Sequence, residues 1–396
     1  MTPLSISAGT VLSAIGAGWA ETDKALCARR SGLRPCDFAG ITAGFAGEVA
    51  GVAEHAFSGP AGFDCRNNRL ADMALGLDGF GKAVAAAAAF YGRARVAVVV
   101  GTSTSGILSA EDAYAATDPE TGAMPADFDQ ARTQDLFSLP RFVATKLGLE
   151  GPLLTVSNAC ASSSRAFVDA RHWLEAGLCD AVVVGGADSL CRMTLRGFAS
   201  LGLVAPGMTR PCDVARDGIS VGEGAGFVLL ERTGVRPDAP VLARWLGYGV
   251  SSDGHHMSSP DPAGRGAVAA MSQALDHAGL QASDIDYINL HGTGTPANDA
   301  MEDRAVFTVF GDQVPCASTK GWTGHTLGAS GIIEAMMAAI MLRQHYLAGC
   351  LNVGAVDPAF KSSVMTETIA ASPAFIMSNA FGFGGTNCSL LFGAAG

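Results

Sequence analysis

The sequence is poor in charged residues, and positive charge is the scarcer kind. Asp, Glu, Lys and Arg make up 16% of the 396 residues, against about 25% in an average soluble domain. The 37 acidic side chains outnumber the 26 basic ones, which gives a formal net charge of −11. Binding to nucleic acid needs a basic surface, so this balance argues against a nucleic-acid partner.

Paired cysteines and membrane-length apolar runs are also lacking. None of the ten cysteines lies in a Cys-x-x-Cys pair or in a metal-ligand spacing with histidine. This pattern indicates reduced thiols and a cytoplasmic protein rather than a disulfide framework. Met1–Ala20 is interrupted by Pro, Ser, Thr and Gly, and no Lys or Arg precedes Lys24. We therefore expect neither a membrane span nor a signal peptide.

Apolar residues and glycine are abundant instead. Hydrophobic residues reach 48% of the chain, enough for a large core, and 50 glycines indicate many tight turns and close backbone approaches. Short apolar runs alternate with helical patterns, which predicts an α/β fold. The predicted strands are Val96–Val100, Leu153–Val156, Ala181–Val184, Val228–Leu230 and Tyr287–Leu290, with a buried strand and turn in Ile6–Gly18. The predicted helices are Ala83–Phe90, Ala161–Ala176, Ala267–Ala278 and Ile332–Leu342.

The two halves of the chain resemble each other weakly. Each contains a turn that enters a helix and, later, a glycine-rich segment. The turns at Cys160 and His325 lie 165 residues apart, and the glycine segments around Gly224 and Gly384 lie 160 apart. This matched offset indicates an internal duplication joined within Thr233–Pro240. We predict two halves, 1–236 and 237–396.

Cys160 is the first candidate catalytic residue. It lies in Ser157–Ser164, between a predicted strand and a predicted helix, with an alanine on each side. At a helix N-terminus the macrodipole and the free N–H groups favour the nucleophilic thiolate. The alternative is an ordinary small buried cysteine.

Two further segments carry histidine. His291 follows a predicted strand and precedes the glycines and threonines of Gly292–Thr295, although it could simply cap a turn. Lys320 and His325 lie in a loop that enters the apolar helix containing Glu334. A buried acid needs a partner, so Lys320 and Glu334 are expected to form an ion pair, whether structural or catalytic.

A fourth segment places phenylalanines between glycines, in Asn379–Asn387. It is typical either of a mobile aromatic loop with accessible amides or of an ordinary glycine-rich turn. No lysine or helical pattern follows as in a phosphate-binding loop, so an amide that stabilises an oxyanion, or a gate, fits better.

Together the four motifs resemble the β-ketoacyl-[acyl-carrier-protein] synthases, the condensing enzymes of the thiolase fold. The resemblance covers essentially the whole chain, from Ser5 to Phe392. It implies duplicated thiolase-like halves in a five-layered α-β-α-β-α architecture. The matching positions are Cys160, His291, Lys320 with His325, and Phe381–Gly385. A Cys-His-His combination is that of the chain-elongating branch.

The resemblance implies a decarboxylative Claisen condensation between an acyl chain on the cysteine and malonyl-acyl-carrier-protein. This reaction yields a 3-oxoacyl-acyl-carrier-protein in fatty-acid or related polyene or polyketide biosynthesis. The expected catalytic residues are Cys160, His291, His325 and Lys320, and the acids that support them are Glu334, Asp299 and Glu302. The amides of Cys160 and Phe383 would bind the oxyanion, and Phe383 would also act as a gate. The expected substrate-binding residues are Thr293, Thr295, Phe198 and Phe381, and pocket depth would depend on Ile107 and Leu108.

The resemblance also implies partners. Acyl carrier protein would bring the phosphopantetheine arm, and no bound cofactor or catalytic metal is expected. Docking of this acidic carrier is expected on Arg66, Arg69 and Arg210. The chain would form a homodimer, or a heterodimer with a chain-length-factor-like subunit. A structural monovalent cation is considered at four oxygen-bearing residues, Asn289, Glu334, Ser378 and Asn379.

Two other functions fit the same resemblance. A non-catalytic chain-length factor lacks the nucleophile, so the presence of Cys160, His291 and His325 argues against it. A degradative thiolase acting on coenzyme A esters carries a second catalytic cysteine in a late Cys-x-Gly motif, and Cys388 does not match that motif.

Overall fold

Two groups of five strands with the same topology form the centre of the molecule. A computed structural model describes residues 1–395. Within each group the spatial order, counted along the chain, is third, second, fourth, fifth, first. The N-terminal group is β6 (Leu153–Val156), β5 (Val96–Gly101), β7 (Ala181–Asp188), β9 (Gly224–Arg232) and β1 (Leu4–Ser13). The C-terminal group is β12 (Pro315–Ala317), β11 (Tyr287–Asn289), β16 (Phe375–Gly382), β17 (Thr386–Gly393) and β10 (Ala243–Ser252).

Strand direction repeats as well. In both groups the second strand runs parallel to the third and the fourth, and the fifth runs antiparallel to the fourth and the first. β1 pairs with β10 and joins the groups into one sheet. β2 (Gly16–Ala17) and β14 (Ser363–Val364) extend this sheet, and the division expected at 236/237 falls between β9 and β10. Two small sheets are separate: β3 (Arg34–Pro35) with β4 (Phe45–Gly47) and β8 (Val221–Gly222), and β13 (Tyr346–Leu347) with β15 (Ile369–Ala370).

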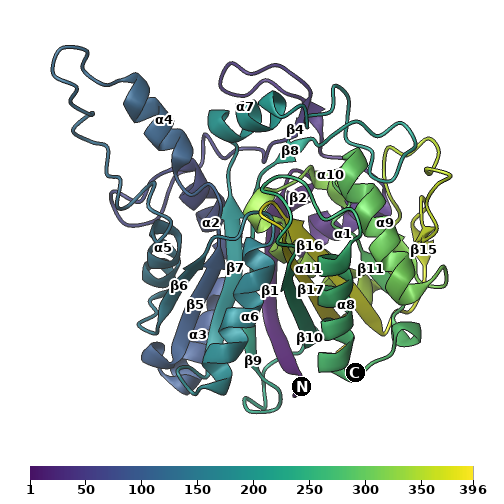
Figure 1. The fold of residues 1–396 in the computed structure, drawn as a ribbon. Coiled ribbons are helices and arrows are strands. Elements are labelled where there is room, and N and C mark those ends of the chain that lie inside the picture. Colours follow the sequence, from purple (N-terminus) through teal and green to yellow (C-terminus); the bar gives the residue numbers. More distant parts are fainter. Residues whose placement is uncertain (396) are drawn as a thin grey trace.

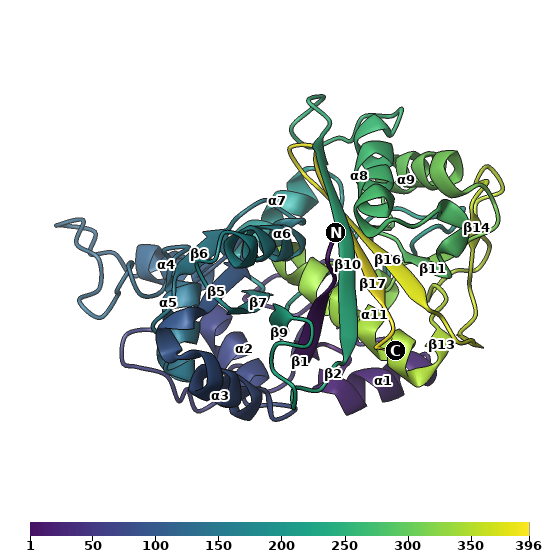
Figure 2. The same cartoon turned by 90° about the horizontal axis from the view of Figure 1, so that it is seen from below.

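Helices form the other three layers. α6 (Ser162–Glu175) and α11 (Ser330–Gln344) lie between the two groups of strands, as the view in Figure 2 shows. One outer layer contains α2 (Arg66–Leu75), α3 (Phe80–Tyr91) and α5 (Ser138–Leu147), and the other contains α8 (Arg265–Ala278) and α9 (Pro296–Phe310). The predicted five-layered, duplicated thiolase fold is therefore confirmed.

The remaining helices surround this frame. α4 (Ile107–Ala115) and the segment after it extend from the body at the upper left of Figure 1. The others are α1 (Trp19–Cys27), α7 (Arg192–Ser200), the one-turn α10 (Lys320–Thr323) and three short 3-10 turns at Arg93–Arg95, Ala282–Asp284 and Leu327–Ala329. Among residues 1–395 no single helix has the length and hydropathy of a membrane span; α2 and α3 pass only as a pair, by length and composition, with a 75° bend.

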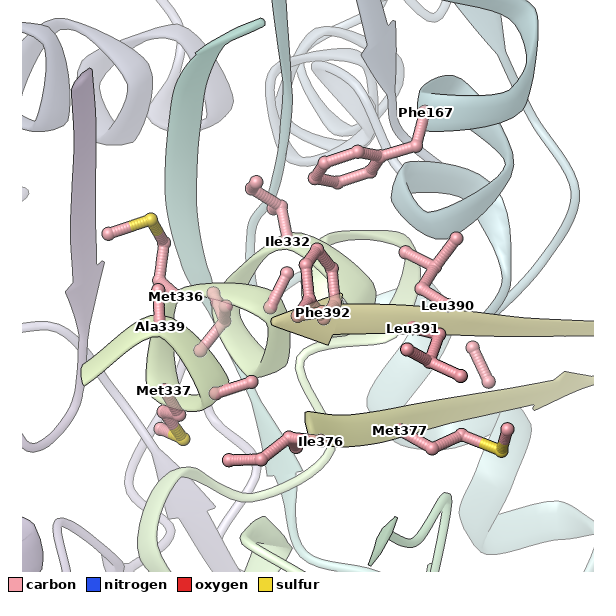
Figure 3. Packing of buried hydrophobic residues seen from close by; sticks show 14 of the residues in the cluster. Phe167, Ile332, Met336, Met337, Ala339, Ile376, Met377, Leu390, Leu391 and Phe392 are labelled. Carbon is pink, nitrogen blue, oxygen red and sulfur yellow. The ribbon is translucent and has the colours of Figure 1, made fainter. Parts of the chain in front are cut away.

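The middle layer explains why α11 is apolar all round. Every residue from Ser330 to Leu342 is buried, because one side of the helix faces β16 and β17 and the other faces β1 and β9. Figure 3 shows Ile332 and Met336 of α11 among side chains from α6 and β17. A Cβ at position 331 would lie 2.0 Å from Ser164 Oγ, so glycine is what permits α6 and α11 to approach this closely.

Candidate active site

Cys160 lies in the turn between β6 and α6. Ala159 has φ +48°, in the left-handed region that residues with a side chain rarely adopt, so the turn is sharp and strained. The hairpin between β16 and β17 packs directly against this turn. A Cβ at Gly382 would lie 3.2 Å from both the Asn158 carbonyl oxygen and the Cys160 nitrogen. The Phe383 amide thereby reaches the sulfur as a hydrogen-bond donor.

His291 and His325 converge on the same sulfur. One side-chain nitrogen of each lies within 4.8 Å of the other and of Cys160 Sγ. His325 Nε2 is 2.9 Å from Sγ, and the two imidazole rings stand edge to face with centroids 5.4 Å apart. His291 follows β11, and His325 follows β12 just before α11, which is the position that Cys160 occupies in the other half. The structure thus brings together three residues singled out from separate motifs.

Burial controls the protonation of this group. It raises the pKa of the Cys160 thiol to about 11, against opposing effects of Lys320 and of the Phe383 amide. Burial thus opposes the thiolate that the helix N-terminus is expected to favour, and the resting thiolate stays a prediction. Burial also lowers the pKa of His291 and His325 well below the usual value, with Lys320 adding to the effect, so both rings are neutral.

Lys320 and Glu334 form the expected ion pair, with Nζ and Oε1 2.6 Å apart and both side chains buried. Burial raises the pKa of Glu334, and Lys320 opposes that rise. The amine of Lys320 therefore acts electrostatically on both imidazoles and is paired with one carboxylate.

The two other predicted acids hold the backbone beside His291. Glu302 accepts the amides of His291 and Gly292 at 2.8 and 2.7 Å, and burial raises the pKa of its carboxyl group to about 7. Asp299 accepts the amides of Cys212 and Gly294, and burial raises its pKa as well. Both acids thus position the loop and do not touch the reacting sulfur.

A cavity of about 100 Å³ opens over Cys160, His291 and His325. Its walls include all four side chains expected to bind substrate, namely Thr293, Thr295, Phe198 and Phe381, and also Phe383. The rings of Phe198 and Phe383 pack with centroids 5.8 Å apart. Phe198 and Leu108 also pack on an apolar cluster that includes Leu190 and Leu195. Sequence reasoning missed the opposite wall, Asp253 and Ser258–Pro260, because a loop carries no periodic signal.

Two positioning residues were also missed. Asp188, the last residue of β7, is fully buried and accepts hydrogen bonds from Thr102, Ser103, Thr104 and the Gly328 amide. An acid at the end of a buried apolar strand is a usable signal. Ser330 contacts His325 Nδ1 at 3.0 Å, but a serine at the start of a helix is too common to be singled out.

The expected docking arginines are all engaged in ion pairs. Arg66 has only 11% of its side chain exposed and contacts the buried Glu223, so it is a structural residue rather than a surface cation. Arg69 pairs with Asp64 and Arg210 with Asp217, and both stay partly exposed. The expectation is therefore unsupported for Arg66 and stays a prediction for the other two.

The residues considered for a structural cation differ in their hydrogen bonding. Glu334 Oε2 is buried and has no hydrogen-bond donor among residues 1–395, as an ion ligand would. Asn379 Oδ1, in contrast, already accepts a hydrogen bond from Ser389. Asn289 and Ser378 are register partners on β11 and β16. The cation stays a prediction.

The fold and the grouping of Cys160, His291 and His325 are those expected of a thiolase-type condensing enzyme. Sequence models of two domains match most of the chain: "Beta-ketoacyl synthase, N-terminal domain" over residues 78–235 and "Beta-ketoacyl synthase, C-terminal domain" over residues 242–354. The chain belongs to the β-ketoacyl synthase family.

Individual relatives agree with this assignment. The chain is 38% identical over 267 residues to the mitochondrial 3-oxoacyl-[acyl-carrier-protein] synthase of Arabidopsis thaliana, a match that covers 63% of this chain and 58% of the relative. It is 37% identical, with a TM-score of 0.88 and coverage of 100% and 98%, to a chain in the structure of ketosynthase ApeO with its chain length factor ApeC from Xenorhabdus doucetiae. The ishigamide ketosynthase/chain length factor gives 29% identity, a TM-score of 0.88 and full coverage of both chains.

Proposed function

We propose that the protein is a β-ketoacyl-[acyl-carrier-protein] synthase, an acyltransferase that condenses a cysteine-bound acyl chain with a malonyl thioester. The observation that carries this proposal is the meeting of Cys160 Sγ, His291 and His325 within 4.8 Å at the base of one cavity. A sulfur nucleophile and two neutral imidazoles are the groups that thioester exchange and decarboxylation require.

In the first step Cys160 is acylated. Its sulfur attacks the thioester carbon of an acyl group on a carrier protein, the carbon–sulfur bond to the carrier breaks, and the thiol proton leaves with the carrier thiol. The negative charge that forms on the carbonyl oxygen is stabilised by the amides of Cys160 and Phe383, which already point at the sulfur. One such donor contributes roughly 3 kcal/mol to the transition state.

In the second step a malonyl thioester enters and loses CO2. The electron pair of the broken carbon–carbon bond passes into the thioester as an enolate, and its carbon attacks the acyl carbon on Cys160. The carbon–sulfur bond to Cys160 then breaks, the 3-oxoacyl product stays on the carrier protein, and the released thiolate takes up a proton from water to restore the thiol. His291 and His325 donate to the enolate oxygen. A neutral imidazole carries one N–H, so each ring can donate this hydrogen to the enolate oxygen without first taking up a proton.

The substrates of this reaction arrive on a carrier protein. Thr293 and Thr295, whose hydroxyls lie 2.9 Å apart in the cavity wall, would bind the amides of the phosphopantetheine arm. We propose no bound cofactor and no catalytic metal. Arg69 and Arg210 remain the docking cations, and Phe383 remains the gate that admits the second substrate. The cytoplasmic location rests on the reduced cysteines, whereas the Arabidopsis relative is named mitochondrial.

The quaternary partner is either a second copy or a chain-length factor. Two structural relatives that match this chain over its whole length are a ketosynthase with its chain length factor and a ketosynthase/chain length factor. We propose that this chain supplies the catalytic subunit of such a pair, because it retains Cys160, His291 and His325 in a formed cavity.

Intact-mass measurement after incubation with a panel of acyl carrier proteins tests the proposal. The wild type should gain one acyl mass and, after addition of malonyl carrier protein, release the 3-oxoacyl product. Cys160→Ala should gain no mass, whereas Cys27→Ala, which removes an exposed thiol, should behave as wild type. Acylation that persists in Cys160→Ala, or condensation of acetyl-CoA alone without malonyl substrate, would overturn the proposal.

A further inference from the structure

His325 differs from His291 in what its second ring nitrogen contacts. Nδ1 of His325 lies 3.0 Å from the hydroxyl of Ser330, the first residue of α11. The same hydroxyl lies 3.2 Å from the hydroxyl of Thr326. Nδ1 of His291, in contrast, is buried with no hydrogen-bond partner in the described chain, residues 1–395. Only one of the two imidazoles is therefore held by a side chain.

Solvent does not reach this contact. The exposed fractions of Ser330, Thr326 and His325 are 1%, 2% and 3%, so their hydrogens must find acceptors within the protein. Burial and Lys320 keep His325 neutral, which leaves one N–H to be placed on either Nδ1 or Nε2. Two arrangements of the hydroxyl hydrogens are then available.

In the first arrangement Thr326 donates to Ser330 and Ser330 donates to Nδ1. The imidazole hydrogen is then on Nε2, which faces Cys160 Sγ at 2.9 Å. Both hydroxyl hydrogens and the imidazole hydrogen have acceptors, and only the thiol hydrogen of Cys160, a weak donor, has none.

In the second arrangement Nδ1 donates to Ser330 and Ser330 donates to Thr326. Among residues 1–395 the hydroxyl hydrogen of Thr326 then has no acceptor, because its oxygen contacts Ser330 Oγ alone. A buried hydroxyl without an acceptor is more costly than an unpaired thiol. The first arrangement is therefore favoured.

We propose that Ser330 is a positioning residue that fixes the tautomer of His325, with its hydroxyl donating to Nδ1 so that Nε2 carries the hydrogen directed at the reacting sulfur and thioester. This inference rests on the proposed function for its catalytic consequence but not for the tautomer itself. An Nε2 lone pair would repel the enolate oxygen, whereas Nε2–H donates to it. Ser330 thus prepares the donor before substrate arrives.

Nitrogen-15 NMR of the full chain with labelled histidine rings tests the tautomer without any substrate. Among the eight histidines, the signals of His325 are assigned by their absence in His325→Gln. The wild type should show a protonated Nε2 and an unprotonated Nδ1 at this residue. Ser330→Ala should shift His325 toward a mixture of the two tautomers, and Ser330→Thr, which keeps the hydroxyl, should restore the wild-type pattern.

Two control variants separate this role from general packing. Ser163→Ala removes another buried hydroxyl between α6 and α11, the acceptor of the Ile332 amide, and should leave the tautomer unchanged. Thr326→Val should also leave it unchanged, because Ser330 still has Nδ1 as its only acceptor. A protonated Nδ1 in the wild type, or an unchanged His325 in a folded Ser330→Ala protein, would overturn the inference. If Ser330→Ala does not fold, the wild-type spectrum alone decides.

Kinetics then connect the tautomer to the reaction. Release of CO2 from malonyl carrier protein should fall about tenfold in Ser330→Ala, the effect of one neutral hydrogen bond, while acylation of Cys160 measured by mass stays at the wild-type rate. Ser330→Thr should recover the decarboxylation rate. A protein that shows the Ser330-dependent tautomer but condenses no substrate would refute the proposed function and leave the tautomer assignment intact. Equal slowing of acylation and decarboxylation would refute the positioning role.

Discussion

At the scale of single residues, the site is a neutral assembly built around one buried cation. Burial disfavours the charged form of Cys160, His291 and His325. Lys320 lowers the pKa of all three. Lys320 Nζ contacts Glu334 Oε1 at 2.6 Å. We therefore expect the Cys160 thiol to lose its proton when the thioester substrate binds, rather than to rest as a thiolate.

The pH dependence of Cys160 alkylation checks this view. With the thiol pKa near 11, the rate with iodoacetamide should rise about tenfold per pH unit from pH 7 to pH 9.5, because the thiolate fraction rises in that proportion. A Cys27→Ala background removes the exposed thiol from the measurement. A rate that levels off near neutral pH would show a resting thiolate–imidazolium pair instead.

At the scale of elements, the contact between α6 and α11 fixes the distance between the two reactive turns. α6 begins just after Cys160 and α11 just after His325, so any shift between these helices is transmitted to both side chains. The Ile332 amide donates to Ser163 across the junction, and Gly331 faces Ser164 with no room for a methyl group. Rigid packing in the middle layer thus sets the geometry at the sulfur.

Gly331→Ala should cost about 1–3 kcal/mol of unfolding free energy, because the new methyl group would push α11 away from α6. Urea unfolding measures this, and condensation activity should fall with it. Gly197→Ala in α7 is the matched control: no atom lies within 4 Å of the added carbon, so this change should stabilise by about 0.5–1 kcal/mol. Equal stabilities for the two variants would contradict the role given to the junction.

Asp188 joins a second pair of elements. It binds the loop after β5 and the Gly328 amide, three residues beyond His325. Asp188→Asn should lower stability by about 3 kcal/mol and reduce kcat more than KM, since an amide nitrogen cannot accept from the donors around it. Asp276→Asn, on the exposed side of α8, should change neither quantity. Wild-type kcat in a folded Asp188→Asn enzyme would rule out this positioning role.

At the scale of the whole molecule, the sequence predicted the elements whose buried residues follow a regular pattern. It did not predict the elements that form only through contacts with residues distant in the chain. The valine-rich run that forms β5 and the apolar stripe of α8 were predicted closely, because strands and helices buried on a long face carry a periodic pattern. The two-residue strands β3 and β8 carry no such pattern and were not predicted.

The same division holds for the site. Cys160, His291, His325 and the Lys320–Glu334 pair could be identified from motifs, whereas the docking role expected of Arg66 finds no support in its burial and pairing. A cation that pairs with Glu223, 157 positions away, looks in the sequence like any surface arginine. The effect of burial on the pKa of Cys160 was also missed, since it depends on the β16–β17 hairpin, which packs against the turn.

Glu302 links the site to the pH dependence of overall stability. Its folded pKa of about 7 lies above the ordinary value of 4.5, so the folded state binds the proton more tightly. Stability contributed by the protonated carboxyl is present below pH 4.5 and is lost as pH rises to about 7. Relative to Glu302→Gln, the wild type should therefore lose about 3 kcal/mol across this window, measured by urea unfolding at stepped pH. A pH-independent difference between the two proteins would contradict the raised pKa.

The repeated strand order has one more consequence. Cys160 and His325 occupy equivalent positions in the two copies of one topology. Each lies between the third strand of its group and the helix that the group contributes to the middle layer. Two identical copies would place the same side chain at both positions, and two identical groups could not act as nucleophile and donor. In the proposed reaction one copy supplies the nucleophilic sulfur and the other a hydrogen-bond donor, so the shared topology aligns the two groups and their divergence makes them reactive toward each other's substrate.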